Sequence, residues 1–148
     1  MVKKISKEEL ALCADCTCFN IRKTSRVVTQ VYDELMHETD LRGTQFTVLV
    51  MVAAFGPVTI SLLADNLVMD RTTLTRNLKP LEKRGLLEIV PGEDRRTRAV
   101  QLMDAGHDML SEALPLWREA QQKIAHFMGK ERLDNLLGEL RSLEKMAK

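Results

Sequence analysis

Aromatic side chains are scarce in this sequence of 148 residues: phenylalanine, tyrosine and tryptophan together make up 4% of it. Sheets are enriched in aromatic and β-branched residues, whereas leucine, methionine and alanine, which abound here, favour helices. The composition therefore favours a mainly helical fold. With only 7 glycines and 4 prolines the chain has no low-complexity linker, and its length predicts a single domain over residues 1–148.

Long apolar runs are also missing. The longest, such as residues 48–55, fall far short of the roughly 20 apolar residues that a membrane-spanning helix needs, so we expect no membrane contact. The first ten residues, MVKKISKEEL, become charged where a secretory signal would be apolar. Three cysteines, all between Cys13 and Cys18, do not suggest a secreted disulfide framework. We therefore expect a cytoplasmic protein.

Neither a strong net charge nor a catalytic motif is present. The formal net charge is +1 at pH 7. We find no phosphate-binding loop, no G-x-S-x-G and no metalloprotease helix. Glu93 and Asp94 are adjacent carboxylates, but they fall in an exposed turn and not in a catalytic pocket. We therefore predict a protein that is not an enzyme and that needs neither a cofactor nor a metal.

Charge is nevertheless uneven along the chain. Residues 70–100 contain eight basic and five acidic side chains, a net charge of +3, while the rest of the chain carries −2. A basic segment in a nearly neutral chain points to a polyanionic partner.

The expected helices and strands follow one another in an informative order. Apolar stripes, caps and turn residues predict a long helix over 7–38, a buried helix over 44–55, two short helices capped by Thr59 and Asp70, strands over 86–90 and 98–102, and helices over 104–128 and 130–147. A helix–turn–helix followed directly by a two-stranded hairpin is a winged helix–turn–helix. We therefore predict a mainly α fold with a two-stranded β wing, in which residues 44–102 form the DNA-binding lobe.

The second short helix combines an apolar face with a polar, cationic one. Its leucines form a core-facing stripe, whereas Thr72, Thr73 and Arg76 project from other faces near the N-terminal end. In a recognition helix this end enters the major groove, where Arg can bond guanine and Thr can contact a base. Lys79, further along, suits a phosphate. The alternative is an ordinary amphipathic helix with a solvated polar face.

The hairpin favours the first interpretation. Its tip places Glu93, Asp94, Arg95 and Arg96 in a row. A wing that lays arginine into the narrow, electronegative minor groove accounts for this cluster of charges. The alternative is that a charged tip keeps strand edges from pairing. Because helix and hairpin occur in the required order, we predict that the protein binds double-stranded DNA.

Four motifs run without gaps from about residue 41 to residue 106: LRGTQFTVL, VTISLLADNL, DRTTLTRNLKPLEKRGLL and the hairpin sequence EDRRTRAVQL. With these motifs the chain resembles the MarR/SlyA family of bacterial transcriptional regulators. Asp94, Arg95 and Arg96 match the family's D-x-R in the wing. The flanking helices agree in length, so the resemblance extends over nearly the whole chain.

The resemblance implies a homodimer that binds a pseudo-palindromic operator, usually as a repressor. Residues 1–38 and 104–148 would form the interlocking N- and C-terminal dimerisation helices. Arg96 would enter the minor groove, Asp94 would hold the wing, and Ser61 would face the DNA backbone. Together with the analysis of the helix and the hairpin, this gives the following candidate DNA-binding residues: Ser61, Arg71, Thr72, Thr73, Thr75, Arg76, Lys79, Asp94, Arg95, Arg96 and Arg98.

Pro80 departs from the family pattern because it lies inside the expected recognition helix. Proline removes one backbone hydrogen bond and bends a helix. We therefore expect the end of this helix, with Lys83 and Arg84, to tilt away from the duplex.

Cys13, Cys16 and Cys18 fall within the first predicted helix. Cys13 and Cys16 are three residues apart and can face the same side, whereas Cys16 and Cys18 point apart. Three interpretations remain open: small apolar residues of a dimer interface, thiols that sense oxidants, and ligands of a soft metal. Because MarR-like regulators include thiol sensors, the three are candidate sensor thiols.

A small-molecule inducer is the other candidate signal. The resemblance places ligand pockets between the dimer helices and the DNA-binding lobe, with Arg22, His107 and Trp117 as candidate lining residues. A winged helix can also serve as a protein-binding adaptor. Such adaptors often lack a basic helix face and wing tip, and we expect a salt-sensitive affinity for DNA to separate the two functions.

Overall fold

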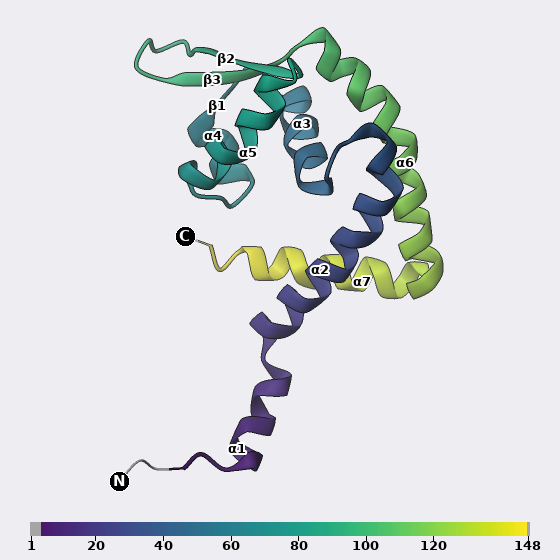
Figure 1. Ribbon diagram of the computed structural model, residues 1–148. Helices are drawn as coiled ribbons and strands as arrows, with labels where there is room; N and C mark the ends of the chain where they lie inside the picture. The colour runs from purple at the N-terminus through teal and green to yellow at the C-terminus, as the bar shows by residue number, and fades with distance from the viewer. Residues whose placement is uncertain (1–3, 148) are drawn as a thin grey trace.

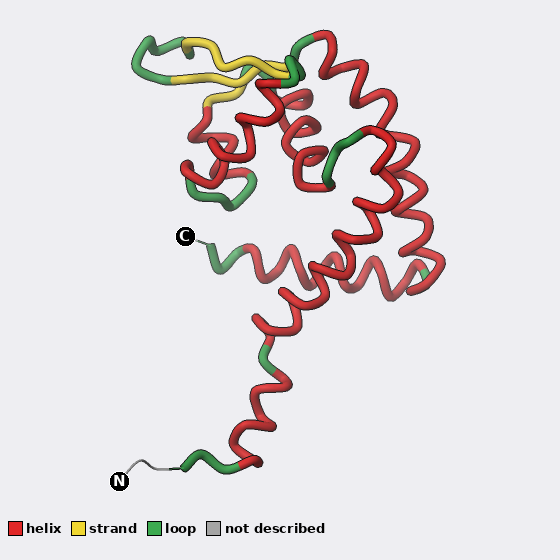
Figure 2. The backbone as a smooth tube through the Cα atoms, viewed as in Figure 1, coloured by secondary structure: helices red, strands yellow, loops and turns green. Residues whose placement is uncertain are grey.

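A computed structural model describes residues 4–147 and places them in a helical frame that carries a smaller lobe (Figure 1). The elements in chain order are α1 (Lys7–Ala11), the 3-10 helix η1 (Leu12–Asp15), α2 (Thr17–Met36), the 3-10 helix η2 (His37–Thr39), α3 (Gly43–Phe55), β1 (Val58–Thr59), α4 (Ile60–Asn66), α5 (Arg71–Lys83), β2 (Leu87–Pro91), β3 (Arg98–Leu102), α6 (Asp104–Met128) and α7 (Lys130–Glu144). Helices dominate, and the strands are confined to one corner (Figure 2). Within residues 4–147 no helix is long and apolar enough to cross a bilayer.

The sheet has three strands, in the order β1–β3–β2, so the prediction of a two-stranded wing was incomplete. β2 and β3 form the expected antiparallel hairpin, in which Leu87 pairs with Leu102. The two residues of β1 pair with β3 through Val58 and Val100. A strand of two residues is too short to show an alternation of apolar and polar residues. Its pairing partner also lies about 40 residues away in the sequence, so no local pattern predicts it.

The core of the lobe lies beneath α5. Leu74, Leu78 and Leu81 are fully buried, as the stripe predicted, and they belong to one cluster with Leu49 of α3 and Leu63 of α4. Burying a leucine stabilises a fold by roughly 1.5–3 kcal/mol. This apolar stripe therefore fixes which face of α5 is turned outward.

Local capping signals set the ends of the short helices, as expected. The hydroxyl of Thr59 accepts a hydrogen bond from the Leu62 amide, 3.2 Å away, and so caps α4. Asp70 caps α5 by accepting from the Thr73 amide at 2.8 Å. Gly85 follows α5 with a φ of +69°, a left-handed conformation that glycine adopts without strain.

The long first helix was predicted wrongly as one piece. The helix stops in η1, and Cys16 has an extended ψ of 118° before α2 begins. The Asn20 amide stabilises this break by donating to the carbonyls of Ala14 (2.8 Å) and Cys16 (2.9 Å). Cysteine, aspartate and threonine are weak helix formers, and residues 4–27 are exposed in the single chain, so packing within the chain does not favour a continuous helix here.

Both predicted C-terminal helices are present, and Gly129, with a φ of +81°, separates α6 from α7 as expected. Pro80 and Pro115 lie inside α5 and α6, and each helix continues through its proline. In Figure 1, α2, α6 and α7 form the frame, and α1 extends away from the body.

Candidate nucleic-acid interface

The outward face of α5 is a polar and cationic surface. Because the leucine stripe holds the opposite face in the core, five predicted side chains are left together along a shallow hollow of about 410 Å³: Arg71, Thr72, Thr75, Arg76 and Lys79. All of them are exposed except the half-buried Thr75, whose hydroxyl donates to the Arg71 carbonyl at 2.7 Å. The surface presents three cations and a free threonine side chain to a partner in solution.

Thr73 was predicted to face DNA, but its hydroxyl has a local role. It donates to Oδ2 of Asp70 at 2.6 Å, while its amide donates to Oδ1. The hydrogen bond from the Thr73 hydroxyl is the main cause that holds the pKa of Asp70 below its ordinary value, and the bond from the Thr73 amide is the second. Thr73 therefore completes the N-cap of α5. Because its hydroxyl proton is already used, its methyl group is left for contact with DNA.

The tip of the β2–β3 hairpin is ordered by Asp94. Its carboxylate accepts from the Arg96 amide at 2.9 Å and forms an ion pair with Arg96 Nε at 3.5 Å. Its carbonyl accepts from both the amide and the hydroxyl of Thr97 at 2.8 and 2.7 Å. The side chain of Arg96 nevertheless remains 92% exposed. Asp94 thus holds the turn in shape while Arg96 stays available.

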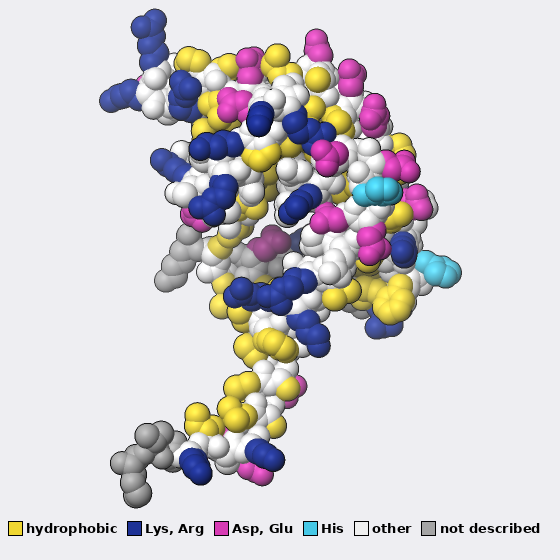
Figure 3. All heavy atoms as spheres, in the orientation of Figure 1, with side chains coloured by type: hydrophobic (Ala, Val, Ile, Leu, Met, Phe, Trp, Pro, Cys, Tyr) yellow, Lys and Arg dark blue, Asp and Glu magenta, His cyan; other side chains and the backbone are white. Residues whose placement is uncertain are grey.

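The remaining predicted residues lie around these two elements. Arg95 and Arg98 are exposed, at the tip and at the start of β3, and Ser61 is half-buried on α4. In the view of Figure 3, dark-blue cationic side chains gather over the hairpin tip and the adjoining lobe, and acidic side chains line the edge formed by α6. Further cationic side chains lie over the helical frame in the same view, so the candidate interface is one of several cationic areas.

Arg84 has a contact that sequence reasoning missed. Its guanidinium donates to the carbonyls of Asp40 (2.7 Å) and Thr39 (3.2 Å), at the corner between α2 and α3. These bonds tie the end of α5 to a segment more than 40 residues earlier. The expectation that Arg84 does not face DNA agrees with this position, but no local pattern could reveal its partner.

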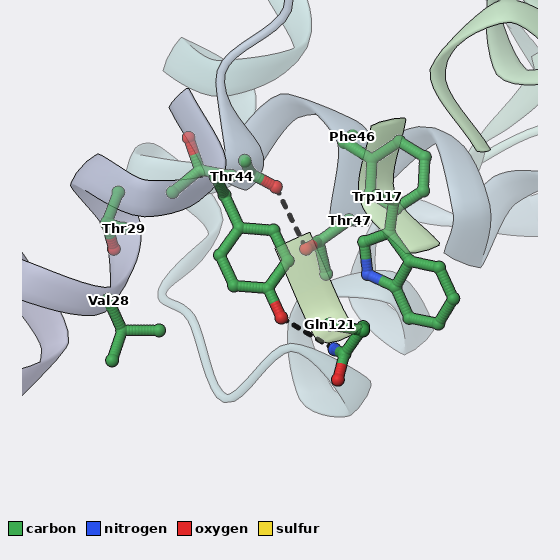
Figure 4. Close-up of a pocket in the computed structure, with 9 residues that line it drawn as sticks. Val28, Thr29, Thr44, Phe46, Thr47, Trp117 and Gln121 are labelled. Carbon is green, nitrogen blue, oxygen red and sulfur yellow. Dashed lines mark hydrogen bonds between the residues drawn. The ribbon is translucent and has the colours of Figure 1, made fainter. Parts of the chain in front are cut away.

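The three residues predicted to line one ligand pocket do not lie together. Trp117 lines a cavity of about 340 Å³ between α2, α3 and α6 (Figure 4). His107 lines a separate hollow beside Gly56 and Pro57. Arg22 is exposed on α2 and lines neither. Tyr32 and Gln121, which do line the cavity with Trp117, were missed, although Gln121 follows Trp117 by one helical turn.

The cysteines lie at the break that separates η1 from α2. All three are exposed and free, and Cys16 donates its amide to the Cys13 carbonyl at 3.2 Å. The intact helix predicted through Cys13 and Cys16 is therefore wrong: a 3-10 turn joins the two residues, and such a turn places residues three apart on the same side. Within the described residues no group of three potential ligands is close enough to hold a metal ion.

Two short helices joined by a turn, the second held to the core by its leucine stripe, and a charged hairpin that follows directly together define a winged helix–turn–helix protein. A model of the MarR family matches residues 39–97. The DNA-bound transcriptional regulator MosR of M. tuberculosis is 31% identical, covers 90% of this chain and all of its own, and superposes with a TM-score of 0.79. The chain belongs to the MarR family.

Curated relatives match over a shorter stretch. An HTH-type transcriptional regulator of Bacillus cereus is 33% identical over 86 residues, 58% of this chain and 57% of that protein. The organic hydroperoxide resistance transcriptional regulator of Bacillus subtilis is 28% identical over 90 residues, 60% of this chain and 61% of that protein. The aligned region thus spans a little over half the length of these relatives.

Proposed function

We propose that this protein is a sequence-specific DNA-binding transcriptional regulator that acts as a homodimeric repressor of a pseudo-palindromic operator. The observation that carries this proposal is the pairing of two exposed cationic elements on one lobe: the outward face of α5 and the tip of the β2–β3 hairpin. A helix for the major groove beside a hairpin for the minor groove is the arrangement that a winged helix uses on DNA. The DNA complex of MosR supports the same function.

Each side chain has a role that follows from its chemistry. Thr72 and Arg76, on the first half of α5, reach base edges in the major groove. Arg71 and Lys79 neutralise phosphates, as do Arg95 and Arg98 near the hairpin tip, and Ser61 of α4 bonds the backbone. Arg96 enters the minor groove, where the electrostatic potential is most negative. Asp94 orients Arg96 and, unlike the others, makes no favourable contact with DNA itself.

The homodimer is supported by apolar side chains that the single chain leaves uncovered. Phe127 at the end of α6 is 87% exposed, and Leu136, Leu137 and Leu143 of α7 are 39%, 37% and 42% exposed. A mostly apolar groove of about 540 Å³ runs between α2, α6 and α7. Such a surface needs a partner, and a second copy that offers the same helices buries both sets at once.

We further propose that a chemical signal releases the operator, through a small molecule or through oxidation. For oxidation, Cys13 and Cys16 are the candidate pair, because the hydrogen-bonded turn between them keeps their Cα atoms within about 7 Å. A hydroperoxide would oxidise the two thiols to one disulfide and would itself be reduced to an alcohol and water. The name of the Bacillus subtilis relative supports an oxidant as the signal.

The test of DNA binding is selection from a random pool of duplexes, followed by titration of the selected site and a scrambled one at two salt concentrations. A regulator binds the selected site about 10³-fold or more tightly than the scrambled one. The logarithm of its binding constant falls linearly with the logarithm of the salt concentration. If no site is enriched and the affinity does not depend on salt, the chain is a protein-binding adaptor instead.

The dimer is tested by sedimentation of Leu136→Glu beside Leu62→Glu. Both leucines are exposed, at 39% and 51%, but Leu62 lies on α4, away from the proposed interface. We expect only Leu136→Glu to halve the mass in solution. If both variants keep the wild-type mass, or if the wild type is a monomer, the dimer proposal fails.

The oxidative signal is tested by treating the wild type and Cys18→Ser with peroxide before the DNA titration. Both should lose operator binding and regain it with a thiol reductant, whereas Cys13→Ser should keep binding. If peroxide leaves the DNA affinity of the wild type unchanged, the cysteines do not sense an oxidant. The cavity beside Trp117 then remains as the candidate site for a small-molecule signal.

A further inference from the structure

The turn that joins α4 to α5 is closed by a Schellman motif, a common way to end a helix. The amide of Val68 donates to the Asp65 carbonyl at 3.1 Å, and the amide of Met69 donates to the Ala64 carbonyl at 2.9 Å. This pair of bonds places a left-handed residue directly after the helix cap, and Val68 occupies that position with a φ of 50°. Glycine is the usual residue there, because it has no Cβ to crowd the backbone.

The end of α5 shows the same motif with its usual residue. Gly85 has a φ of 69° and donates its amide to the Glu82 carbonyl at 2.9 Å, and the Leu86 amide donates to the Leu81 carbonyl at 3.1 Å. Two consecutive helices therefore end in the same way, one with glycine and one with valine. A β-branched residue with a positive φ is a conformational outlier. Within residues 4–147 the other positive φ outside glycine belongs to Asp40, and aspartate tolerates it better than most residues.

Packing within the chain does not explain the valine, because its side chain is 66% exposed. The other three residues of the turn each have a structural role. Leu67 packs against the core, and Asp70 caps α5. The sulfur of Met69 accepts a hydrogen bond from Nδ2 of Asn77 at 3.8 Å. Val68 instead combines an unfavourable backbone conformation with an exposed apolar side chain, and such an outlier points to a function outside the fold itself.

Val68 lies close to the side chains that we propose to contact DNA. It precedes Arg71 by three residues, so the Cα atoms of the two are at most about 11 Å apart. Arg71 and Thr72 are exposed on the outward face of α5. In a helix–turn–helix the N-terminal end of the second helix enters the major groove. The turn that leads into this end of α5 therefore comes close to the duplex.

The chemistry of the side chain limits what it can recognise on DNA. An isopropyl group has no hydrogen-bond donor or acceptor, so it can bond neither a phosphate nor a polar base edge. It matches the apolar group that the major groove displays, the C5-methyl of thymine. We propose that Val68 is a specificity-determining residue that contacts a thymine methyl in each half-site of the operator. This inference rests on the proposed function, because it requires a bound duplex.

The test compares the wild type with Val68→Gly and Val68→Asn on the selected operator, in which each thymine is replaced in turn by deoxyuridine. Deoxyuridine lacks only the C5-methyl, and both glycine and asparagine adopt a left-handed φ more readily than valine. For the wild type we expect one deoxyuridine in each half-site to weaken binding about fourfold, the value of one buried methyl group. Both variants should bind the thymine operator more weakly and should not respond to that deoxyuridine.

Thermal unfolding gives a second readout that involves no DNA. Val68→Gly should raise the melting temperature by about 2–4 °C, because it relieves the backbone. The matched reverse change is Gly85→Val, which should lower the melting temperature by a similar amount. A Cβ added at Gly85 has no atom beyond its chain neighbours within 4 Å, so this variant reports the backbone conformation and not a clash. A variant that gains stability and loses operator affinity is what a strained contact residue predicts.

Three results would overturn the proposal: no thymine whose methyl affects binding, a Val68→Gly variant that responds to deoxyuridine as the wild type does, or a Val68→Gly variant that is no more stable than the wild type. An equal loss of affinity for the operator and a scrambled duplex would also exclude a methyl contact. These results leave the proposed regulator standing, because the wild type still binds its selected site. If selection enriches no site, the proposed function fails, and this inference fails with it.

Discussion

Replacing Arg84 by alanine removes a tie between the end of α5 and the corner that joins α2 to α3. The guanidinium donates to two backbone carbonyls, those of Asp40 and Thr39, at 2.7 and 3.2 Å. Asp40 has a left-handed φ of 52°, a conformation that aspartate tolerates better than most residues. The tie therefore binds a tight turn whose own residue already suits it.

A hydrogen bond from a charged group contributes about 1.5–3 kcal/mol when its partner is shielded from water. Arg84 is exposed and its bond to Asp40 is open to solvent, so water replaces part of each bond after the substitution. We therefore expect Arg84→Ala to lower the free energy of unfolding by roughly 1.5–3 kcal/mol in total, the value of one such bond and not of two. Arg84→Lys, which can reach one carbonyl at a time, should recover about half of this loss.

The assay is urea unfolding followed by circular dichroism, at one fixed protein concentration because a dimer unfolds in a concentration-dependent way. Lys83→Ala is the control, since Lys83 is an exposed neighbour at the same helix end. If Arg84→Ala and Lys83→Ala have the same midpoint, the tie contributes nothing to the stability of the fold.

Three further outcomes follow from the described contacts. Arg96→Ala should weaken operator binding without changing the proposed dimer or the melting temperature, since the side chain is 92% exposed; unchanged affinity would show that the tip does not touch DNA. Arg76→Ala should lose about 1–3 kcal/mol of discrimination at one base position, whereas Lys79→Ala should weaken all sequences alike and reduce the salt slope by about one; the reverse pattern would exchange their roles. The lowered pKa of Asp70 means that its cap contributes fully above its ordinary pKa of 3.8 and that the contribution is lost as the pH falls through the lower folded value. Asp70→Asn should therefore flatten the acid limb of the stability curve below about pH 4, and an unchanged limb in unfolding titrations would rule this out.

Features that depend on neighbours in the sequence were predictable. Thr59, Asp70 and Gly85 set the ends of the short helices, because a cap or a left-handed glycine acts on residues only three or four positions away. The leucine stripe of α5 likewise identified its outward face. Most of the candidate DNA-binding residues follow from these local signals.

Features that depend on distant contacts were not predictable. β1 exists because β3 pairs with it, Arg84 has its partners more than 40 residues away, and the bond between Gln121 and Tyr32 joins residues 89 positions apart. The break at Cys16 was missed for the opposite reason: without burial, weak helix formers decide the backbone, and no proline or glycine marks the site.

The two residues of β1 have a consequence for the DNA that the lobe can accept. Thr59 both pairs with Ala99 of β3 and caps α4, while α4 packs against α5 in the common core. The base of the hairpin is thereby joined through one short strand to α4, and through the common core to α5. Because this connection restricts how far the hairpin base can move relative to α5, we expect part of the adjustment on binding to come from the duplex. Sites whose minor groove lies at the wrong phase or is too stiff to move would be rejected even where every contacted base is correct.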